Sequence, residues 1–129
     1  MILVICADNA FGMAFGGRRQ SKDAALRQRL LELAGGRLRM SPYSAKQFDG
    51  GIYAGPDYLT GAGDGDWCFV ENGDYKTLPQ APERIVIFRW NRDYPADLHF
   101  EFPGQWRLVS QEDFPGTSHE KLTQEVYEP

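Results

Sequence analysis

Apolar residues along this 129-residue chain fall into short continuous runs, separated by turns rich in glycine, proline and aspartate. Ile2–Ala7 is apolar throughout, which is typical of a central strand covered on both faces. Glu83–Asn91 is rich in Ile, Val, Phe and Trp and predicts the strongest strand of the chain. Further strands are predicted over Arg37–Ser41, Ile52–Ala54, Trp67–Glu71, His99–Phe102, Trp106–Ser110 and Leu122–Glu128.

One segment has helical periodicity instead. Leu26, Leu30 and Leu33 recur at i, i+4 and i+7 ahead of a pair of glycines, which predicts a helix ending near residue 34. Ser21 is the expected N-cap of this helix, with Asp23 in its first turn. Shorter helices are predicted over Pro42–Phe48 and Pro56–Ala62.

The order of these elements predicts the fold class. Strands alternating with helices come first and a run of strands follows, so we expect an α/β fold with a mixed, mostly parallel sheet and antiparallel strands at one edge. No linker, repeat or low-complexity segment interrupts residues 1–129, which are expected to form one domain. A content of 42% hydrophobic and 25% charged residues excludes a disordered or fibrous chain.

The first strand has no basic residues before it, so it does not resemble a signal peptide, and no apolar run is long enough to span a membrane. Cys6 and Cys68 both lie in strand-like runs and are interpreted as reduced core thiols, which favours a cytoplasmic protein.

The net charge of −4 is unevenly distributed. Residues 1–48 hold eight Lys and Arg against three Asp and Glu, whereas residues 49–129 hold six against fifteen. Such a basic cluster either contacts phosphates or an acidic partner, or is a solvated helix face. Its members are Arg18, Arg19, Lys22, Arg27, Arg29, Arg37 and Arg39.

Several strings resemble the dihydrofolate reductase family. A first strand, a loop with Gly12 and Met13, and an acid about ten residues later, Asp23, are similar to that family's opening. Ser44 stands where its Gly-Arg-x-Thr cofactor motif has threonine. Residues Glu83–Phe100 and the stretch from Trp106 to Tyr127-Glu128 resemble its sixth strand and its closing antiparallel hairpin. The resemblance implies a dihydrofolate reductase-like fold, with Asp23 as the carboxylate that holds the pterin.

The departures from that family concern its cofactor, NADPH. Ser41-Pro42 replaces the Gly-Arg that grips the 2′-phosphate, and Glu71-Asn72 replaces paired glycines, leaving only Gly73. A carboxylate at that point repels a pyrophosphate. We therefore expect a protein that has lost NADPH-dependent reduction and binds a small anionic or heterocyclic ligand or a macromolecular partner.

Two alternatives stay open. One is a minimal NADPH-dependent reductase with Asp23 as its catalytic acid and with Ser44 and Gly73 at the cofactor. The other is a nucleic-acid or protein-binding accessory factor that uses the basic loop at Arg18 and Arg19, where an anion would meet a helix N-terminus. The candidate ligand-binding residues are Gly12, Met13, Arg18, Arg19, Ser21, Asp23, Ser44, Trp90 and Asn91.

Metal chemistry has no support in the sequence. His99 and His119 lack metal-ligand spacing. The Arg18–Ser21 and Trp90–Pro95 strings also resemble small bacterial proteins loosely labelled ribonuclease Z, but nothing here predicts the two-metal site of that enzyme. The shortened sheet edge is consistent with a homodimer.

Overall fold

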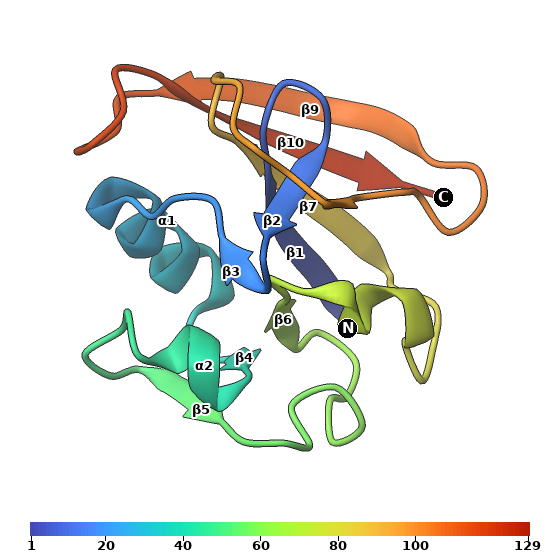
Figure 1. The fold of residues 1–129 in the computed structure, drawn as a ribbon. Coiled ribbons are helices and arrows are strands. Elements are labelled where there is room, and N and C mark those ends of the chain that lie inside the picture. Colours follow the sequence, from blue (N-terminus) through green and yellow to red (C-terminus); the bar gives the residue numbers. More distant parts are fainter.

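The computed structural model describes all 129 residues, most of which are arranged around a seven-stranded sheet (Figure 1). Its strands are β1 (Ile2–Ala7), β4 (Leu38–Met40), β5 (Ile52–Ala54), β6 (Trp67–Phe69), β7 (Arg84–Arg89), β9 (Arg107–Phe114) and β10 (Leu122–Glu128). They lie in the order β5-β4-β6-β1-β7-β10-β9. The first five are parallel to one another, and β10 runs antiparallel to both β7 and β9. The predicted mixed, mostly parallel sheet with a closing antiparallel hairpin is confirmed.

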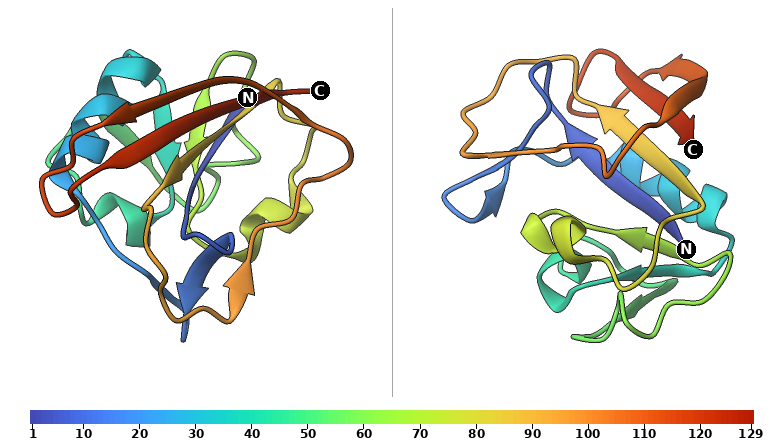
Figure 2. Two further views of the ribbon diagram at one scale, coloured as in Figure 1. Left: turned by 90° about the horizontal axis from the view of Figure 1, so that it is seen from above. Right: turned by 90° about the vertical axis from the view of Figure 1, so that its right-hand side faces the viewer.

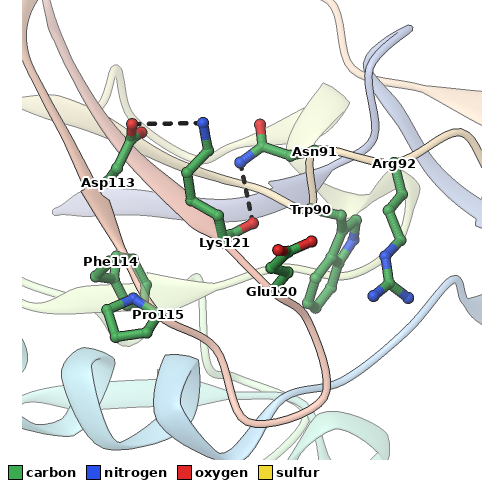
Figure 3. Close-up of a pocket in the computed structure, with 8 residues that line it drawn as sticks. All are labelled: Trp90, Asn91, Arg92, Asp113, Phe114, Pro115, Glu120 and Lys121. Atoms are coloured by element: carbon green, nitrogen blue, oxygen red, sulfur yellow. Dashed lines mark hydrogen bonds and ion pairs between the residues drawn. The ribbon is translucent and has the colours of Figure 1, made fainter.

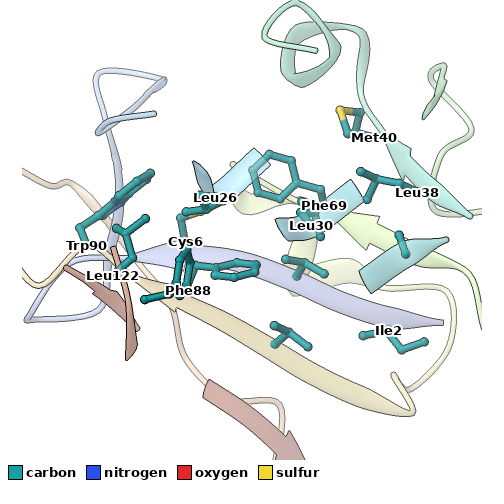
Figure 4. Close-up of a cluster of buried hydrophobic side chains, with 14 residues drawn as sticks. Ile2, Cys6, Leu26, Leu30, Leu38, Met40, Phe69, Phe88, Trp90 and Leu122 are labelled. Carbon is teal, nitrogen blue, oxygen red and sulfur yellow. The ribbon is translucent and has the colours of Figure 1, made fainter. Parts of the chain in front are cut away.

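One face of the sheet is covered by α1 (Ala24–Ala34) and, nearer the β5 edge, by α2 (Pro42–Ala45). Leu26 and Leu30 on α1 pack against Val4 and Cys6, which point to this face because side chains alternate along β1. Figure 4 shows this core, which continues to Trp90 at the end of β7.

The opposite face is covered by a second, three-stranded sheet. Its strands are β3 (Arg18–Arg19), β2 (Gly12–Phe15) and β8 (Leu98–His99), in that order, and the 3-10 helix η1 (Gly73–Thr77) packs on the same side (Figure 2). Met13, Tyr75 and Phe100 pack there against Leu3 and Ile5. Both α-helices therefore lie on one face, and the other face is covered by the three short strands and η1.

The loop predicted around Gly12 and Met13 is wrong, because these residues begin β2, which forms a hairpin with β3. Phe15 pairs with Arg18, and the two residues between them, Gly16 and Gly17, have φ of 59° and 74°. A two-residue hairpin turn of this kind needs positive φ at both positions, which glycine adopts without strain.

Other boundaries differ from the predictions. Pro56–Ala62 is a series of turns rather than a helix, and the helix at Pro42 ends at Ala45. β9 is longer than predicted and runs to Phe114, because pairing with β10 extends a strand whose own residues are mostly polar. β4, β6 and β7 are shorter than predicted, and β8 begins at Leu98.

The helix start is also corrected. Asp23, not Ser21, is the N-cap of α1, with extended φ and ψ of −152° and 129°. Its carboxylate accepts hydrogen bonds from the first-turn backbone N–H groups. Gly35 ends the helix in the left-handed conformation, as predicted.

Both cysteines are unpaired and buried. Burial raises the pKa of Cys6 well above its ordinary value and that of Cys68 to about 11, so both thiols stay protonated near neutral pH. None of the helices is both long enough and apolar enough to cross a bilayer.

Candidate functional site around Asp23 and His119

The carboxylate of Asp23 is 1% exposed and is surrounded by hydrogen-bond donors. Oδ1 accepts from the backbone N–H groups of Ala25, Leu26 and Thr117 at 2.9, 3.3 and 3.0 Å. Oδ2 accepts from the N–H of Ser118 at 2.7 Å and from His119 twice, through its backbone N–H at 3.2 Å and its ring Nδ1 at 2.9 Å. The N-cap of α1 therefore also fixes the turn between β9 and β10.

That turn approaches Asp23 closely because residue 116 is a glycine. A Cβ atom on Gly116 would lie 2.6 Å from the His119 carbonyl oxygen and 2.8 Å from Asp23 Oδ2. Both distances are shorter than non-bonded atoms tolerate. The absence of a side chain at this position thus allows the backbone of residues 117–119 to reach the carboxylate.

The imidazole of His119 is buried, at 3% exposed, and stacks on Trp90 with ring centroids 4.7 Å apart and planes 25° from parallel. Because the ionised Asp23 only accepts hydrogen bonds, the ring proton of a neutral His119 is placed on Nδ1. Nε2 then presents a lone pair, which faces the hydroxyl groups of Ser21 at 3.1 Å and Tyr94 at 3.0 Å.

Two opposing effects act on the pKa of Asp23. Burial raises it, but hydrogen bonds from the Thr117 backbone, the His119 ring and the Ser118 backbone outweigh burial and hold the pKa well below its ordinary value. The carboxylate is therefore negative at any physiological pH, and it supplies the fixed charge of the site.

A cavity of about 730 Å³ opens beside Trp90, between the end of β7 and the β9–β10 connection (Figure 3). Its walls are mixed in character. Trp90, Phe114 and Pro115 are apolar, whereas the remaining lining residues are polar or charged: Asn91, Arg92, Asp113, Glu120 and Lys121. Asp23 does not line this cavity.

The polar side chains of the cavity are held by neighbours. Lys121 Nζ lies 3.6 Å from Asp113 Oδ2. Asn91 has a positive φ of 59°, and its Nδ2 donates to the Lys121 carbonyl oxygen at 3.1 Å and to Thr123 Oγ1 at 3.0 Å. Arg92 makes a long 3.4 Å contact with the Ser118 carbonyl oxygen. Two cationic and two carboxylate side chains therefore line the cavity, and some of them are held in place by neighbouring residues.

The carboxyl end of β6 is occupied by the protein itself. Glu71, whose side chain is 7% exposed, accepts from Arg19 Nε at 2.9 Å and Nη2 at 3.2 Å, and from Gln47 Nε2 at 3.1 Å. The Arg19 guanidinium also stacks on the Tyr43 ring, 4.3 Å from its centroid. These contacts of Arg19 hold the β2–β3 hairpin against the carboxyl ends of the central strands.

The other predicted site residues are dispersed. Gly12 approaches Asp8 and Gln20 too closely to carry a side chain, and Met13 is buried in the core opposite α1. Ser44 is buried, with its Oγ 3.4 Å from Ser41 Oγ, and Gly73 begins η1. The structure brings together only Ser21, Asp23 and Trp90 around His119, with Asn91 beside them at the cavity.

The predicted basic cluster does not form one free surface. Arg29 pairs with Glu112 of β9, and Arg37 Nε pairs with Asp66 at 2.9 Å. Arg39 stacks on the Tyr53 ring and donates to backbone carbonyl oxygens. The Arg18 side chain is exposed and forms no ion pair within the chain.

Sequence reasoning missed His119, Tyr94 and Gly116. His119 was considered only as a metal ligand, and no three His, Cys, Asp or Glu residues are placed to hold a metal ion. A Gly-x-x-His spacing in a turn before the last strand was the available signal, but it identifies no partner, because Asp23 lies 96 residues away.

No protein-family model matches this chain, and no curated protein is significantly similar to it in sequence.

Proposed function

We propose that this chain is a dihydrofolate reductase-like domain that binds a small anionic heterocycle and does not use NADPH for reduction. The family assignment is supported by a sheet centred on the first strand, by a first helix on one face and by a closing antiparallel hairpin. These are the features that the resemblance in sequence implies.

The observation that carries the proposal is the contact between Arg19 and Glu71. Glu71 stands where the resemblance places paired glycines, at the carboxyl end of β6, and its carboxylate is held by Arg19 and Gln47. Ligands of open α/β sheets bind at the carboxyl ends of the strands. A buried carboxylate that already has its cation offers no charge complement for a pyrophosphate.

The cavity beside Trp90 has the size and chemistry for a different ligand. Its volume of about 730 Å³ lies within the range of small-molecule sites. A pterin carboxylate has an amino and amide edge that donates to a carboxylate such as Glu120, and an acid group that accepts from Arg92 or Lys121. Its flat ring would pack on the apolar wall.

Thermal shift titration tests this proposal with pterin-6-carboxylate and NADPH as probes. At about 100 times its Kd, a ligand adds roughly 2.7 kcal/mol to the free energy of unfolding, which is a visible shift for a domain of this size. We expect stabilisation by the pterin, its loss in Arg92→Ala/Lys121→Ala, and its retention in the control Arg18→Ala, which removes an exposed cation elsewhere.

Two results would overturn the proposal. One is stabilisation by NADPH together with its oxidation in the presence of dihydrofolate, which would make the chain a reductase. The other is a pterin-induced shift that survives the double substitution. The accessory-factor alternative has less support, because Arg19, Arg29 and Arg37 are each paired with a carboxylate.

A further inference from the structure

Ser21, His119 and Asp23 are aligned in one hydrogen-bonded chain. Ser21 Oγ lies 3.1 Å from His119 Nε2, and His119 Nδ1 lies 2.9 Å from Asp23 Oδ2. We propose that Ser21 is a nucleophile activated by this relay, and that the site hydrolyses small activated carboxylic esters. This proposal does not rest on the cavity, so a failed pterin titration leaves it unaffected.

Each member of the relay has the environment that its role needs. A nucleophilic serine requires a base within hydrogen-bond reach, and the base requires a third group that fixes its tautomer. Asp23 is that third group, because it is buried, ionised and held by five backbone N–H groups in addition to the His119 ring. Trp90 stacks on one face of the imidazole. The contact between Nδ1 and Asp23 leaves the in-plane Nε2 lone pair for the hydroxyl groups.

Ser21 itself is only half-buried and lies in the segment that leads into α1. The backbone N–H groups of Lys22 and Ala24 on either side of Asp23 have no partner within the chain. In this proposal they supply the donors for a carbonyl oxygen that becomes negative as Ser21 attacks. The nucleophile is accessible while its base is not.

The reaction is balanced without any oxidant or reductant. Ser21 Oγ forms a bond to the acyl carbon, and its proton passes to His119 Nε2. The bond from the acyl carbon to the leaving alcohol breaks, and the alcohol takes that proton. Water then attacks the acyl-serine by the same route, releasing the carboxylic acid and restoring the Ser21 hydroxyl.

Tyr94 is a second hydroxyl on the same nitrogen, with Oη 3.0 Å from His119 Nε2. A neutral imidazole has one lone pair there, so the two hydroxyl groups compete for it. Tyr94 is therefore a positioning residue that supports the ring, and its removal leaves the lone pair to Ser21.

The test combines an irreversible serine reagent with ester turnover. The reagent is diethyl p-nitrophenyl phosphate, with peptide mass spectrometry to map the adduct, and the substrate is p-nitrophenyl acetate. We expect one adduct, on Ser21. Ser21→Ala should abolish it and lower p-nitrophenolate release at least about 100-fold, the scale of a lost nucleophile–base pair.

Controls separate this role from a structural one. Ser110→Ala removes an exposed serine on β9 and should leave both readouts unchanged. Tyr94→Phe should keep or increase labelling of Ser21, and near-UV circular dichroism checks that each variant is folded. An adduct on Tyr94, no adduct at all, or equal ester turnover by wild type and folded Ser21→Ala would each overturn the proposal.

Discussion

Asp23 Oδ2 and His119 Nδ1 lie 2.9 Å apart across a separation of 96 residues, and this contact joins the start of α1 to the turn before β10. Both side chains are buried, and the carboxylate also accepts hydrogen bonds from the backbone N–H groups of residues 117–119 in that turn. A single acid therefore caps a helix, closes a hairpin connection and orients an imidazole.

Replacing Asp23 with asparagine should destabilise the fold strongly. The new amide would place an N–H₂ group against donors from Ser118 and His119, leaving buried polar groups unpaired. We expect a loss of about 3 kcal/mol or more in the free energy of unfolding, measured by urea denaturation. Asp64→Asn, on the exposed 61–66 turn, is the matched control and should change stability by no more than about 0.5 kcal/mol. Equal effects of the two substitutions would refute the role given to Asp23.

Acid should unfold the wild type partly through Asp23. Its pKa is lowered in the folded protein, so the unfolded chain binds this proton more readily, and the stabilisation is complete above the ordinary aspartate pKa of about 3.9. As pH falls from there toward the folded-state pKa, the stabilisation is lost. Denaturation series between about pH 5 and pH 2 should show a shallower decline for Asp23→Asn than for wild type. Parallel curves would contradict the assignment.

Gly116→Ala should be costly although it adds one methyl group. That methyl would lie within 2.8 Å of Asp23 Oδ2 and 2.6 Å from a backbone oxygen, so the turn must move and weaken its hydrogen bonds. We expect a loss of about 2 kcal/mol. Gly50→Ala is the control, because its Cβ would meet nothing within 4 Å and its φ is not positive. A neutral Gly116→Ala would show that the turn does not need this close approach.

Arg19→Ala and its neighbour Arg18→Ala should behave very differently. The first leaves Glu71 buried without its cation and should cost about 2–3 kcal/mol, below the full penalty for a completely buried pair because the Arg19 side chain is 20% exposed. The second removes an exposed side chain and should be close to neutral. Chemical denaturation measures the free energy of unfolding of both variants. Similar values would mean that the Arg19–Glu71 pair does not stabilise the carboxyl ends of the central strands.

Strand-level features were predictable because they depend on local sequence. β1 and β10 match their predicted bounds, and β7 lies within its predicted range, since continuous apolar runs and β-branched residues specify buried strands. The three-stranded sheet was not predictable. β2 and β8 pair residues such as Gly12 and His99 that are distant in sequence, and neither strand is long enough to show a period of two.

The site was predictable only in part, for the same reason. Asp23 and Trp90 were singled out, but the sequence gives no indication that a turn near residue 119 would reach them. Ser21 was expected to cap α1, as serine before a leucine pattern often does. Asp23 takes that position because its carboxylate accepts from both α1 and the distant turn, which a serine hydroxyl does less well.

The most direct test of the proposed function is a two-dimensional ¹H–¹⁵N NMR titration of the wild-type protein with pterin-6-carboxylate and, separately, with NADPH. We predict that the pterin shifts the Trp90 indole signal and the Glu120 and Lys121 amides, while NADPH at millimolar concentration leaves the amides of Ser44, Glu71 and Gly73 in place. Shifts by NADPH at those three residues, or no shift by the pterin around Trp90, would contradict it.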